Sequence, residues 1–374
     1  MLPRNPTPFN LIAIFLQYFF MKLDLTIWAV ESYRAGETSQ VVGLAEGLHR
    51  ALGWQVVTKR LEYSRLAGPL ALLRAVSVRG ITAAARQTLT PPWPDLLIVA
   101  GARNESVARW VRRASGGQTR IVFIGRTWAR TRHFDLLVTT PQYRVPPAAN
   151  VLENATTLHR VHPARLMLER AAWHATFAPL APPRTVVLVG GDSGPYALRA
   201  ATGRKLAAAV TAHADPDGTV LLTTSSRTHA AAAQSLTDAL PDAWLYRWRP
   251  GDPANPYFGM LAWADAIVVT SDSIAMLSEA LAVGVPVALF DLAAQSDATP
   301  KTRAYQWLMR LGPARLTRDI GIAHARLIAA GAMTRLGERG THVAPAPDHT
   351  QYLPQQDALP RTIQRVAALF ESST

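Results

Sequence analysis

The chain has 374 residues and a formal net charge of +13, from 39 basic and 26 acidic side chains. A chain of this length favours two hydrophobic cores of about 150 to 180 residues each. With 49% hydrophobic residues, the composition excludes both a multi-span membrane protein and a disordered chain. The absence of cysteine excludes disulfides and thiolate chemistry and indicates a reducing compartment, so we expect a cytoplasmic protein.

The positive charge favours phosphates, anionic lipids or nucleic acid as partners. The sequence has no helix-turn-helix or zinc-finger pattern, and no basic run is interleaved with aromatic residues. We therefore expect no nucleic-acid partner.

The first residues, 1–20, contain an apolar run, LIAIFLQYFF. This run is shorter than the roughly 20 apolar residues that a membrane-spanning helix needs. We interpret residues 1–20 as an upstream extension outside the fold, with the functional start at Met21. An interfacial membrane anchor is the alternative.

From Met21 onward, β-forming runs alternate with helical patterns. We predict strands at 25–30, 54–61, 95–100, 120–124, 134–139 and 150–153, and helices at 40–52, 69–89 and 104–113. Such alternation is typical of a parallel, doubly wound sheet. We therefore predict an α/β, Rossmann-like domain over residues 21–178.

A proline-rich segment, FAPLAPPR at 177–184, is typical of a linker, and the alternation restarts after it. We predict strands at 185–189, 219–224, 244–248, 266–269 and 287–290. We predict helices at 196–213, 230–240 and 302–311, and two more that begin at Tyr257 and after Ser273. These elements predict a second Rossmann-like domain over 184–350. A final amphipathic helix within 355–372 is long enough to cross back to the first domain.

The stretch Ala266–Pro286 has the strongest local pattern. Its strand ends in the polar turn Ser271, Asp272 and Ser273, and an Ala/Leu-rich helix follows. The free N–H groups of a first helical turn suit an anion, and Glu279, about two turns along, could accept hydrogen bonds from the hydroxyls of a ribose. The alternative is an ordinary βα unit with a capped helix.

Two further turns in the same half carry ligand-type residues. Gly190 and Gly191 follow a strand, where glycine lets backbone amides approach a ligand. Ser225 and Arg227 lie in TTSSRT at the end of the next strand, and hydroxyls beside a guanidinium suit a diphosphate. The alternatives are a tight turn and a capped helix with a solvated arginine.

Metal-ligating patterns are scarce. HExxH is absent, and Asp215 and Asp217 flank a proline in a predicted turn. His159 and His162 lie beside a proline and fit a domain junction better than a metal site. We expect no metal and no cofactor.

The stretch 60–86 interleaves apolar and basic residues. The apolar members are Leu66, Leu70, Leu72, Leu73, Val76 and Val78, and the arginines include Arg65, Arg74, Arg79 and Arg86. Such a surface could lie on an anionic membrane, which would make the chain a peripheral membrane protein. The alternative is a buried helix with arginines at its polar edge.

Taken together, the two halves, the linker and the turns at strand ends resemble the GT-B glycosyltransferases. More closely, the chain resembles the mitochondrial fission "elongated mitochondria" family, which is GT-B-like. The matching runs are RAGETSQVVGLAEGL (34–48), PPWPDLLIVAGAR (91–103), LVGG (188–191), TTSSRT (223–228), NPYFGMLAWADAIVVTSDSIAMLSEA (255–280) and GVPV (284–287). They span both halves, from about residue 27 to residue 311.

The resemblance implies two Rossmann-like domains that face each other across a cleft, with the acceptor on the first and a nucleotide-sugar donor on the second. It assigns an acceptor-side loop to Arg34, Gly36, Gln40, Gly101 and Arg103. Family members usually carry Asp-Gly before this arginine and Gly-His after it, whereas this chain has Ser32-Tyr33 and Gly36-Glu37. Where the family histidine would act as base, Glu37 would have to replace it.

We therefore predict a metal-independent, GT-B-type glycosyltransferase that uses a nucleotide diphosphate sugar on a cell-envelope or lipid-linked acceptor. A non-catalytic GT-B scaffold that acts through protein or membrane contact is the alternative. A nucleotide-sugar epimerase is a third one, disfavoured because the only Tyr-x-x-x-Lys pair, Tyr18 and Lys22, lies at the N-terminal extension. The predicted location is cytoplasmic, with peripheral attachment to the inner membrane as a variant.

Overall fold

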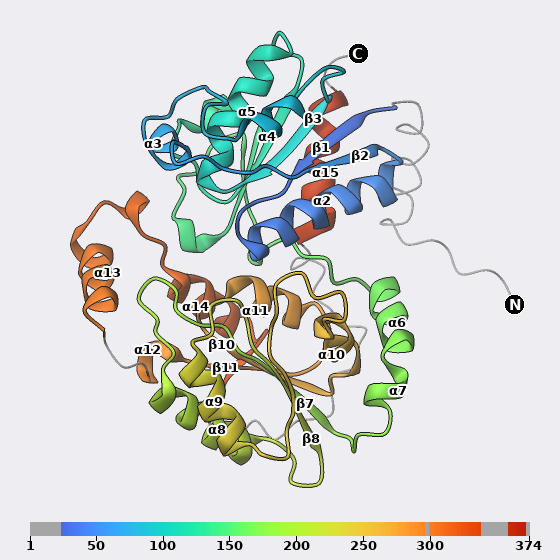
Figure 1. The fold of residues 1–374 in the computed structure, drawn as a ribbon, viewed down its shortest axis with the longest axis vertical. Helices are drawn as coiled ribbons and strands as arrows, with labels where there is room; N and C mark the ends of the chain where they lie inside the picture. The colour runs from blue at the N-terminus through green and yellow to red at the C-terminus, as the bar shows by residue number, and fades with distance from the viewer. Residues whose placement is uncertain (1–23, 296–298, 338–357, 372–374) are drawn as a thin grey trace, which may run out of the picture. The chain divides into compact units, whose positions relative to one another are not determined.

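A computed structural model describes residues 24–295, 299–337 and 358–371. The chain divides into two compact units. Among the described residues, the first unit comprises 24–139, 146–154 and 358–371, and the second comprises 140–145, 155–295 and 299–337. Figure 1 shows that each unit contains a β-sheet with helices packed against it. The predicted extension 1–20 lies outside the described residues, as do 338–350 of the predicted second domain.

The first unit contains a six-stranded parallel sheet of order β2-β1-β3-β4-β5-β6. Its strands are β1 (Thr26–Val30), β2 (Gln55–Lys59), β3 (Leu96–Ala100), β4 (Arg120–Ile124), β5 (Leu136–Thr139) and β6 (Val151–Glu153). Its helices are α2 (Ala35–Leu52), α3 (Ala67–Leu72), α4 (Ala83–Gln87), α5 (Ala102–Ala114), the 3-10 helix η1 (Thr131–His133) and α15 (Ala358–Glu371). The predicted parallel sheet is confirmed.

The sequence of the central strands explains their position in this sheet. All five residues of β3, LLIVA, are buried, as expected for a parallel strand covered on both faces.

The terminal helix α15 packs against α2, and Figure 1 shows the two side by side. A Cβ on Gly47 of α2 would lie 3.0 Å from the Leu359 side chain, and Trp54 meets Phe370 edge to face. The return of the last helix to the first unit is therefore confirmed.

The second unit repeats this architecture, with a six-stranded parallel sheet of order β12-β11-β10-β7-β8-β9. Its strands are β7 (Arg184–Leu188), β8 (Thr219–Thr223), β9 (Trp244–Tyr246), β10 (Ala266–Thr270), β11 (Val287–Phe290) and β12 (Thr334–Arg335). Its helices are η2 (Pro141–Tyr143), α6 (Pro163–Ala172), α7 (His174–Phe177), α8 (Ala200–His213), α9 (Ala230–Ala239), α10 (Tyr257–Trp263), α11 (Ile274–Leu281), α12 (Leu292–Gln295), α13 (Pro300–Leu311), η3 (Ala314–Leu316) and α14 (Ile320–Ala329). Two Rossmann-like α/β units of this kind are the components of the GT-B fold, which confirms the predicted fold class.

The long segment of the second unit begins at residue 155, upstream of the predicted limit of the first domain at 178. The segment between these positions contains α6 and α7, and α6 packs on α10 of the second unit. Arg170 of α6 donates to the carbonyl of Ala262 at 2.8 Å, and its own carbonyl accepts from the Trp263 indole at 3.0 Å. The prolines of 177–184 suggested that the second domain begins after this segment. The contacts of α6 show instead that α6 belongs to the second unit.

The predicted helix 69–89 is wrong, because the structure has two short helices, α3 and α4, in its place. Between them Arg74 adopts a left-handed conformation, with φ at 55°. The Ser77 amide donates to the carbonyl of Ser106 at 3.3 Å, and Thr82 caps the start of α4. Contacts with α5 therefore divide this segment. The sequence also did not predict helix α14 or strand β12, and β12 extends the second sheet at its edge.

None of the helices in the described part of the chain is long and apolar enough to cross a membrane.

Candidate functional site

The Gly190-Gly191 turn follows β7 and is buried. Its amides donate inward, Gly190 to the Thr270 hydroxyl and Gly191 to the Asp272 carboxylate, both at 2.8 Å. A Cβ on Gly190 would lie 2.2 Å from an Asp272 oxygen, and one on Gly191 would lie 2.0 Å from the carbonyl oxygen of Arg227. Only glycine therefore fits at either position, and the groups that approach these glycines are the protein's own.

Asp272 is a buried carboxylate with three contacts. Besides the Gly191 amide, its oxygens accept from the Thr270 hydroxyl at 2.7 Å and pair with Arg227 at 2.8 Å. The Asp272 side chain has no exposed surface, whereas that of Arg227 is 36% exposed. The guanidinium also donates to the carbonyl of Asp192 at 3.3 Å. The structure thus joins three of the predicted donor residues, Gly191, Arg227 and Asp272, in one network.

Ser225 joins the same network through its neighbour Thr228. The Ser225 amide donates to the Thr228 hydroxyl at 2.9 Å, and that hydroxyl contacts the carbonyl of Gly190 at 2.5 Å. This convergence follows from topology, because β10, β7 and β8 are adjacent parallel strands and their carboxyl ends meet at one edge of the sheet. We call this cluster the strand-end network: Gly190, Gly191, Ser225, Arg227, Thr228, Thr270 and Asp272.

The two serines beside Asp272 have local structural contacts. Ser273 caps α11 by accepting from the Met276 amide at 3.5 Å, so the predicted helix start is confirmed. The buried Ser271 hydroxyl accepts from the Leu292 amide at 2.9 Å. Ser271 therefore connects the turn to the segment that follows β11.

Glu279 lies further along α11 and is buried, with 6% of its surface exposed. It accepts a hydrogen bond from the Tyr257 hydroxyl at 2.6 Å. Burial, followed by the charge of Glu279, raises the pKa of Tyr257 well above its ordinary value. The sequence predicted only a helix that begins at Tyr257, whose ring packs edge to face on Phe258. The bond between the Tyr257 hydroxyl and Glu279 was not predicted, because a Tyr and a Glu in neighbouring elements do not by themselves indicate a contact.

In the first unit, the predicted base Glu37 lies in the first turn of α2. Its carboxylate accepts from the Ser32 hydroxyl at 2.5 Å and pairs with Arg34 at 3.2 Å. A Cβ on Gly101, whose φ is +83°, would lie 2.5 Å from the same carboxylate. The structure therefore brings Arg34, Glu37 and Gly101 together. Gln40 binds the carbonyl of Gly36 at 3.0 Å within α2.

Arg103 lies among aromatic side chains of the same unit. Its guanidinium is 4.5 Å from the ring centre of Tyr33 and 5.6 Å from that of Tyr63. The Tyr63 hydroxyl donates to Asn104 at 2.7 Å, and burial raises the pKa of Tyr63 to about 12. Sequence alone indicated Arg103 as a site residue but neither Tyr33 nor Tyr63 as its neighbour, because the three residues are distant in sequence and meet only in the fold.

Metal-ligand candidates are absent among residues 24–295, 299–337 and 358–371, where no three His, Asp or Glu side chains are grouped to hold an ion. Asp215 and Asp217 form the predicted turn, in which the Asp217 amide donates to the Asp215 side chain at 2.9 Å. His162 caps α6, and His159 is buried.

Comparison with known proteins gives a family and a set of distant structural likenesses. Residues 35–319 match the profile of a family described as mitochondrial fission ELM1. The chain is 30% identical over 241 residues to the mitochondrial fission protein ELM1 of Arabidopsis thaliana, a match that covers 58% of this chain and 56% of that protein. The chain thus spans little more than half the length of this curated relative.

Two solved structures illustrate the structural likeness. UDP-GlcNAc 2-epimerase from Neisseria meningitidis, bound to UDP-GlcNAc, has a TM-score of 0.44 and 12% identity, over 82% of this chain and 99% of that one. The ADP-heptose LPS heptosyltransferase II of E. coli has a TM-score of 0.44 and 13% identity, over 82% of this chain and all of that one.

Proposed function

The chain belongs to the mitochondrial fission ELM1 family, and we propose that it is a metal-independent, GT-B-type glycosyltransferase. Its donor is a nucleotide diphosphate sugar, bound by the second unit. Its acceptor is a cell-envelope or lipid-linked hydroxyl compound, bound by the first unit beside Arg34, Gly36, Gln40, Gly101 and Arg103. The protein is cytoplasmic and contacts the inner membrane peripherally.

The observation that carries this proposal is the partly exposed guanidinium of Arg227 in the strand-end network. A guanidinium has five N–H donors, and it suits a phosphate because its fork matches the phosphate oxygens. Two of the Arg227 nitrogens contact Asp272 and the carbonyl of Asp192. Its remaining N–H groups would bind the diphosphate, together with the hydroxyl of Ser225 and the backbone amides near Ser271 to Ser273, just before α11.

In the proposed reaction, the acceptor hydroxyl oxygen forms a bond to the anomeric carbon of the donor sugar. The bond from that carbon to the diphosphate oxygen breaks, and the nucleoside diphosphate leaves with the electron pair. Arg227 stabilises the negative charge that grows on this leaving group. Glu37 accepts the hydroxyl proton, with its carboxylate oriented by Ser32 and Arg34. Glu279 binds the ribose through the carboxylate that Tyr257 orients.

One observation favours a second candidate, a catalytically silent scaffold. The Asp272 carboxylate already accepts from the Gly191 amide and pairs with Arg227, so an internal anion occupies donors that a diphosphate would use. Under this alternative the second unit binds no nucleotide, and the chain acts through protein or membrane contact.

Calorimetric titration with UDP-, GDP-, ADP- and CMP-sugars separates the two candidates. The enzyme requires saturable binding of one class, weakened about 10- to 100-fold by Arg227→Ala, which removes a hydrogen bond to a charged group. Glu279→Ala should weaken the same binding, whereas the control Arg204→Ala, at an exposed position on α8, should not. If Arg227→Ala and Glu279→Ala both leave affinity unchanged, the donor site is refuted. A panel without any binding supports the scaffold.

A further inference from the structure

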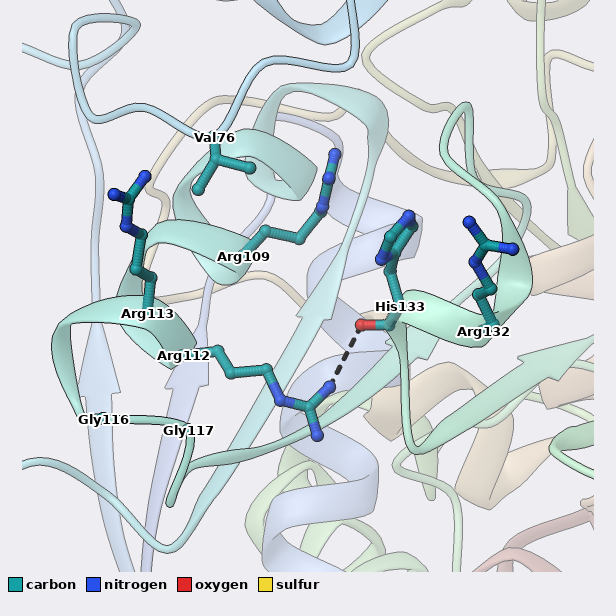
Figure 2. A pocket seen from close by; sticks show the side chains of 8 residues that line it. All are labelled: Val76, Arg109, Arg112, Arg113, Gly116, Gly117, Arg132 and His133. Atoms are coloured by element: carbon teal, nitrogen blue, oxygen red, sulfur yellow. Dashed lines mark hydrogen bonds between the residues drawn. The ribbon is translucent and has the colours of Figure 1, made fainter.

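A hollow in the first unit is lined by four arginines among its eight residues. It has a volume of about 460 Å³, and we call it the arginine hollow. Its lining includes Val76, Arg109, Arg112, Arg113, Arg132 and His133. Figure 2 shows Arg109 and Arg113, from α5, on either side of Val76, with His133 and Arg132 of η1 across from them. The function proposed above uses none of these residues.

The charges in this hollow are only partly neutralised. Arg112 is paired with Asp135 at 2.6 Å and donates to the carbonyl of His133 at 3.1 Å, so its guanidinium is fixed. Within the described part of the chain, Arg109, Arg113 and Arg132 form no ion pair. Three positive charges therefore share one hollow without a carboxylate bound to any of them.

The surrounding groups support this positive field. The Glu105 carboxylate, whose charge interacts with Arg109, is buried and accepts from the Trp128 and Ala129 amides at 2.7 and 2.8 Å. Burial, and then the neighbouring arginines, lower the pKa of His133. The arginines contribute to this shift because their positive charges disfavour a protonated imidazole. An anion would relieve this repulsion.

An exposed apolar segment borders the arginine hollow. Leu66, Leu72, Leu73 and Val76 are 52%, 63%, 76% and 36% exposed, and Val76 itself lines the hollow. The segment is attached to α5 by a hydrogen bond from Arg109 to the carbonyl of Arg74, at 2.8 Å. The predicted alternative of a buried helix therefore does not describe these leucines, because only Ala67 and Ala71 of α3 are buried.

We propose that the arginine hollow binds the phosphate of an anionic phospholipid headgroup, with Leu72 and Leu73 contacting the acyl boundary. A guanidinium group can donate two parallel hydrogen bonds to two oxygens of one phosphate. Each basic residue near an anionic bilayer raises the membrane affinity of a protein about fivefold. Neighbouring apolar side chains favour a lipid over a free phosphate, because only a lipid offers them an apolar partner. This inference locates the peripheral contact proposed above, and it does not depend on sugar transfer.

Vesicle co-sedimentation of the full chain tests the proposal. We expect the wild-type protein to bind vesicles of phosphatidylcholine with phosphatidylglycerol and to bind phosphatidylcholine alone far more weakly. The triple variant Arg109→Gln/Arg113→Gln/Arg132→Gln should lose on the order of a hundredfold in partition coefficient. A matched control, Arg50→Gln/Arg204→Gln/Arg303→Gln, removes the same charge at exposed positions elsewhere and should lose less than tenfold. Equal losses in the two triple variants would overturn the proposal.

Two further variants separate the contributions. Arg113→Gln/Arg132→Gln leaves the Arg109 contact with residue 74 intact, and it should still lose about 25-fold if two arginines act. Leu72→Ser/Leu73→Ser should lose at least about tenfold, since both leucines are expected to leave water. Unchanged partition of the leucine variant would overturn the apolar contact. Circular dichroism melts verify that every variant is folded.

Calorimetry with inorganic phosphate and glycerol phosphate distinguishes a lipid from a soluble source. For a lipid site we expect vesicle binding to exceed the affinity for either soluble ion, and excess phosphate to compete only weakly. Saturable binding of soluble phosphate that the triple variant abolishes, combined with no vesicle binding by the wild type, would overturn the lipid assignment.

Discussion

Asp272 offers the sharpest test of how the second unit is held together. Its carboxylate is fully buried and bonds the Gly191 amide, the Thr270 hydroxyl and the Arg227 guanidinium. Gly191 follows β7, Arg227 follows β8, and Thr270 is the last residue of β10. Asp272 therefore connects the carboxyl ends of three strands. We predict that Asp272→Ala destabilises the second unit much more than Arg227→Ala does.

The magnitudes follow from the exposure of each partner. Removing one member of a buried ion pair costs about 3–5 kcal/mol, because the other charge is left without compensation. Here Arg227 is 36% exposed and can be hydrated, which favours the lower end of that range. Asp272→Ala also leaves the buried Gly191 amide without its acceptor, a loss of about 1–3 kcal/mol. We expect a total of about 3–5 kcal/mol, because such losses are not additive.

Arg227→Ala should lower the free energy of unfolding by only about 1–2 kcal/mol. The carboxylate keeps its hydrogen bonds to the Gly191 amide and the Thr270 hydroxyl, which continue to stabilise its charge. The double variant should therefore resemble Asp272→Ala, with a coupling of about 1–2 kcal/mol between the two residues.

Urea and thermal unfolding, followed by circular dichroism, measure these changes. For a unit of this size the Tm should fall on the order of 10 °C in Asp272→Ala. A loss below about 0.5 kcal/mol, the usual value for a substitution at an ordinary surface site, would refute the reasoning. A larger loss in Arg227→Ala than in Asp272→Ala would show that the guanidinium, and not the carboxylate, connects the turns.

Three other predictions concern buried groups. Burial lowers the pKa of His159 and of His324 to about 4 from 6.5, so as the pH falls through this window the unfolded chain binds protons that the native chain does not. Each histidine should remove about 3 kcal/mol of stability by the end of the window. His→Gln variants should therefore flatten the pH profile of the urea midpoint. NMR titration of the native histidines near their ordinary pKa would contradict this prediction. Tyr257→Phe should cost about 1–3 kcal/mol by removing the donor to a buried carboxylate, and an unchanged urea midpoint would contradict that bond. Gly191→Ala should cost at least about 3 kcal/mol or prevent folding, because its Cβ would meet a backbone oxygen at 2.0 Å, whereas the control Gly68→Ala, with open space around it, should be tolerated.

The architecture of both units could be predicted from local sequence. Runs such as LLIVA at 96–100 and AIVVT at 266–270 have the continuous apolar character of strands covered on both faces. Alternation of such runs with helical patterns predicted two parallel sheets, and Ser273 marked the start of α11. Each of these signals depends on residues within one element.

Elements whose limits depend on distant contacts were not predictable in this way. Helical periodicity over 69–89 did not show that Ser77 would bond to Ser106 and divide the segment into α3 and α4. Proline content suggested a boundary near 178, whereas the contacts of α6 with α10 assign it to the second unit. In both cases a long-range contact outweighed a local preference.

The candidate site, like the fold, could be predicted only in part from the sequence. The sequence by itself determined that glycines, hydroxyls and acidic residues follow the strands of the second half, because turn and capping chemistry is local. Only the tertiary structure decided that Asp272 would accept from an amide 81 positions away and pair with Arg227. It likewise brought Arg132 and Arg109 into one hollow beside Val76. Parallel strands place distant turns at a common edge, and which charges meet there depends on strand order, which no local pattern encodes.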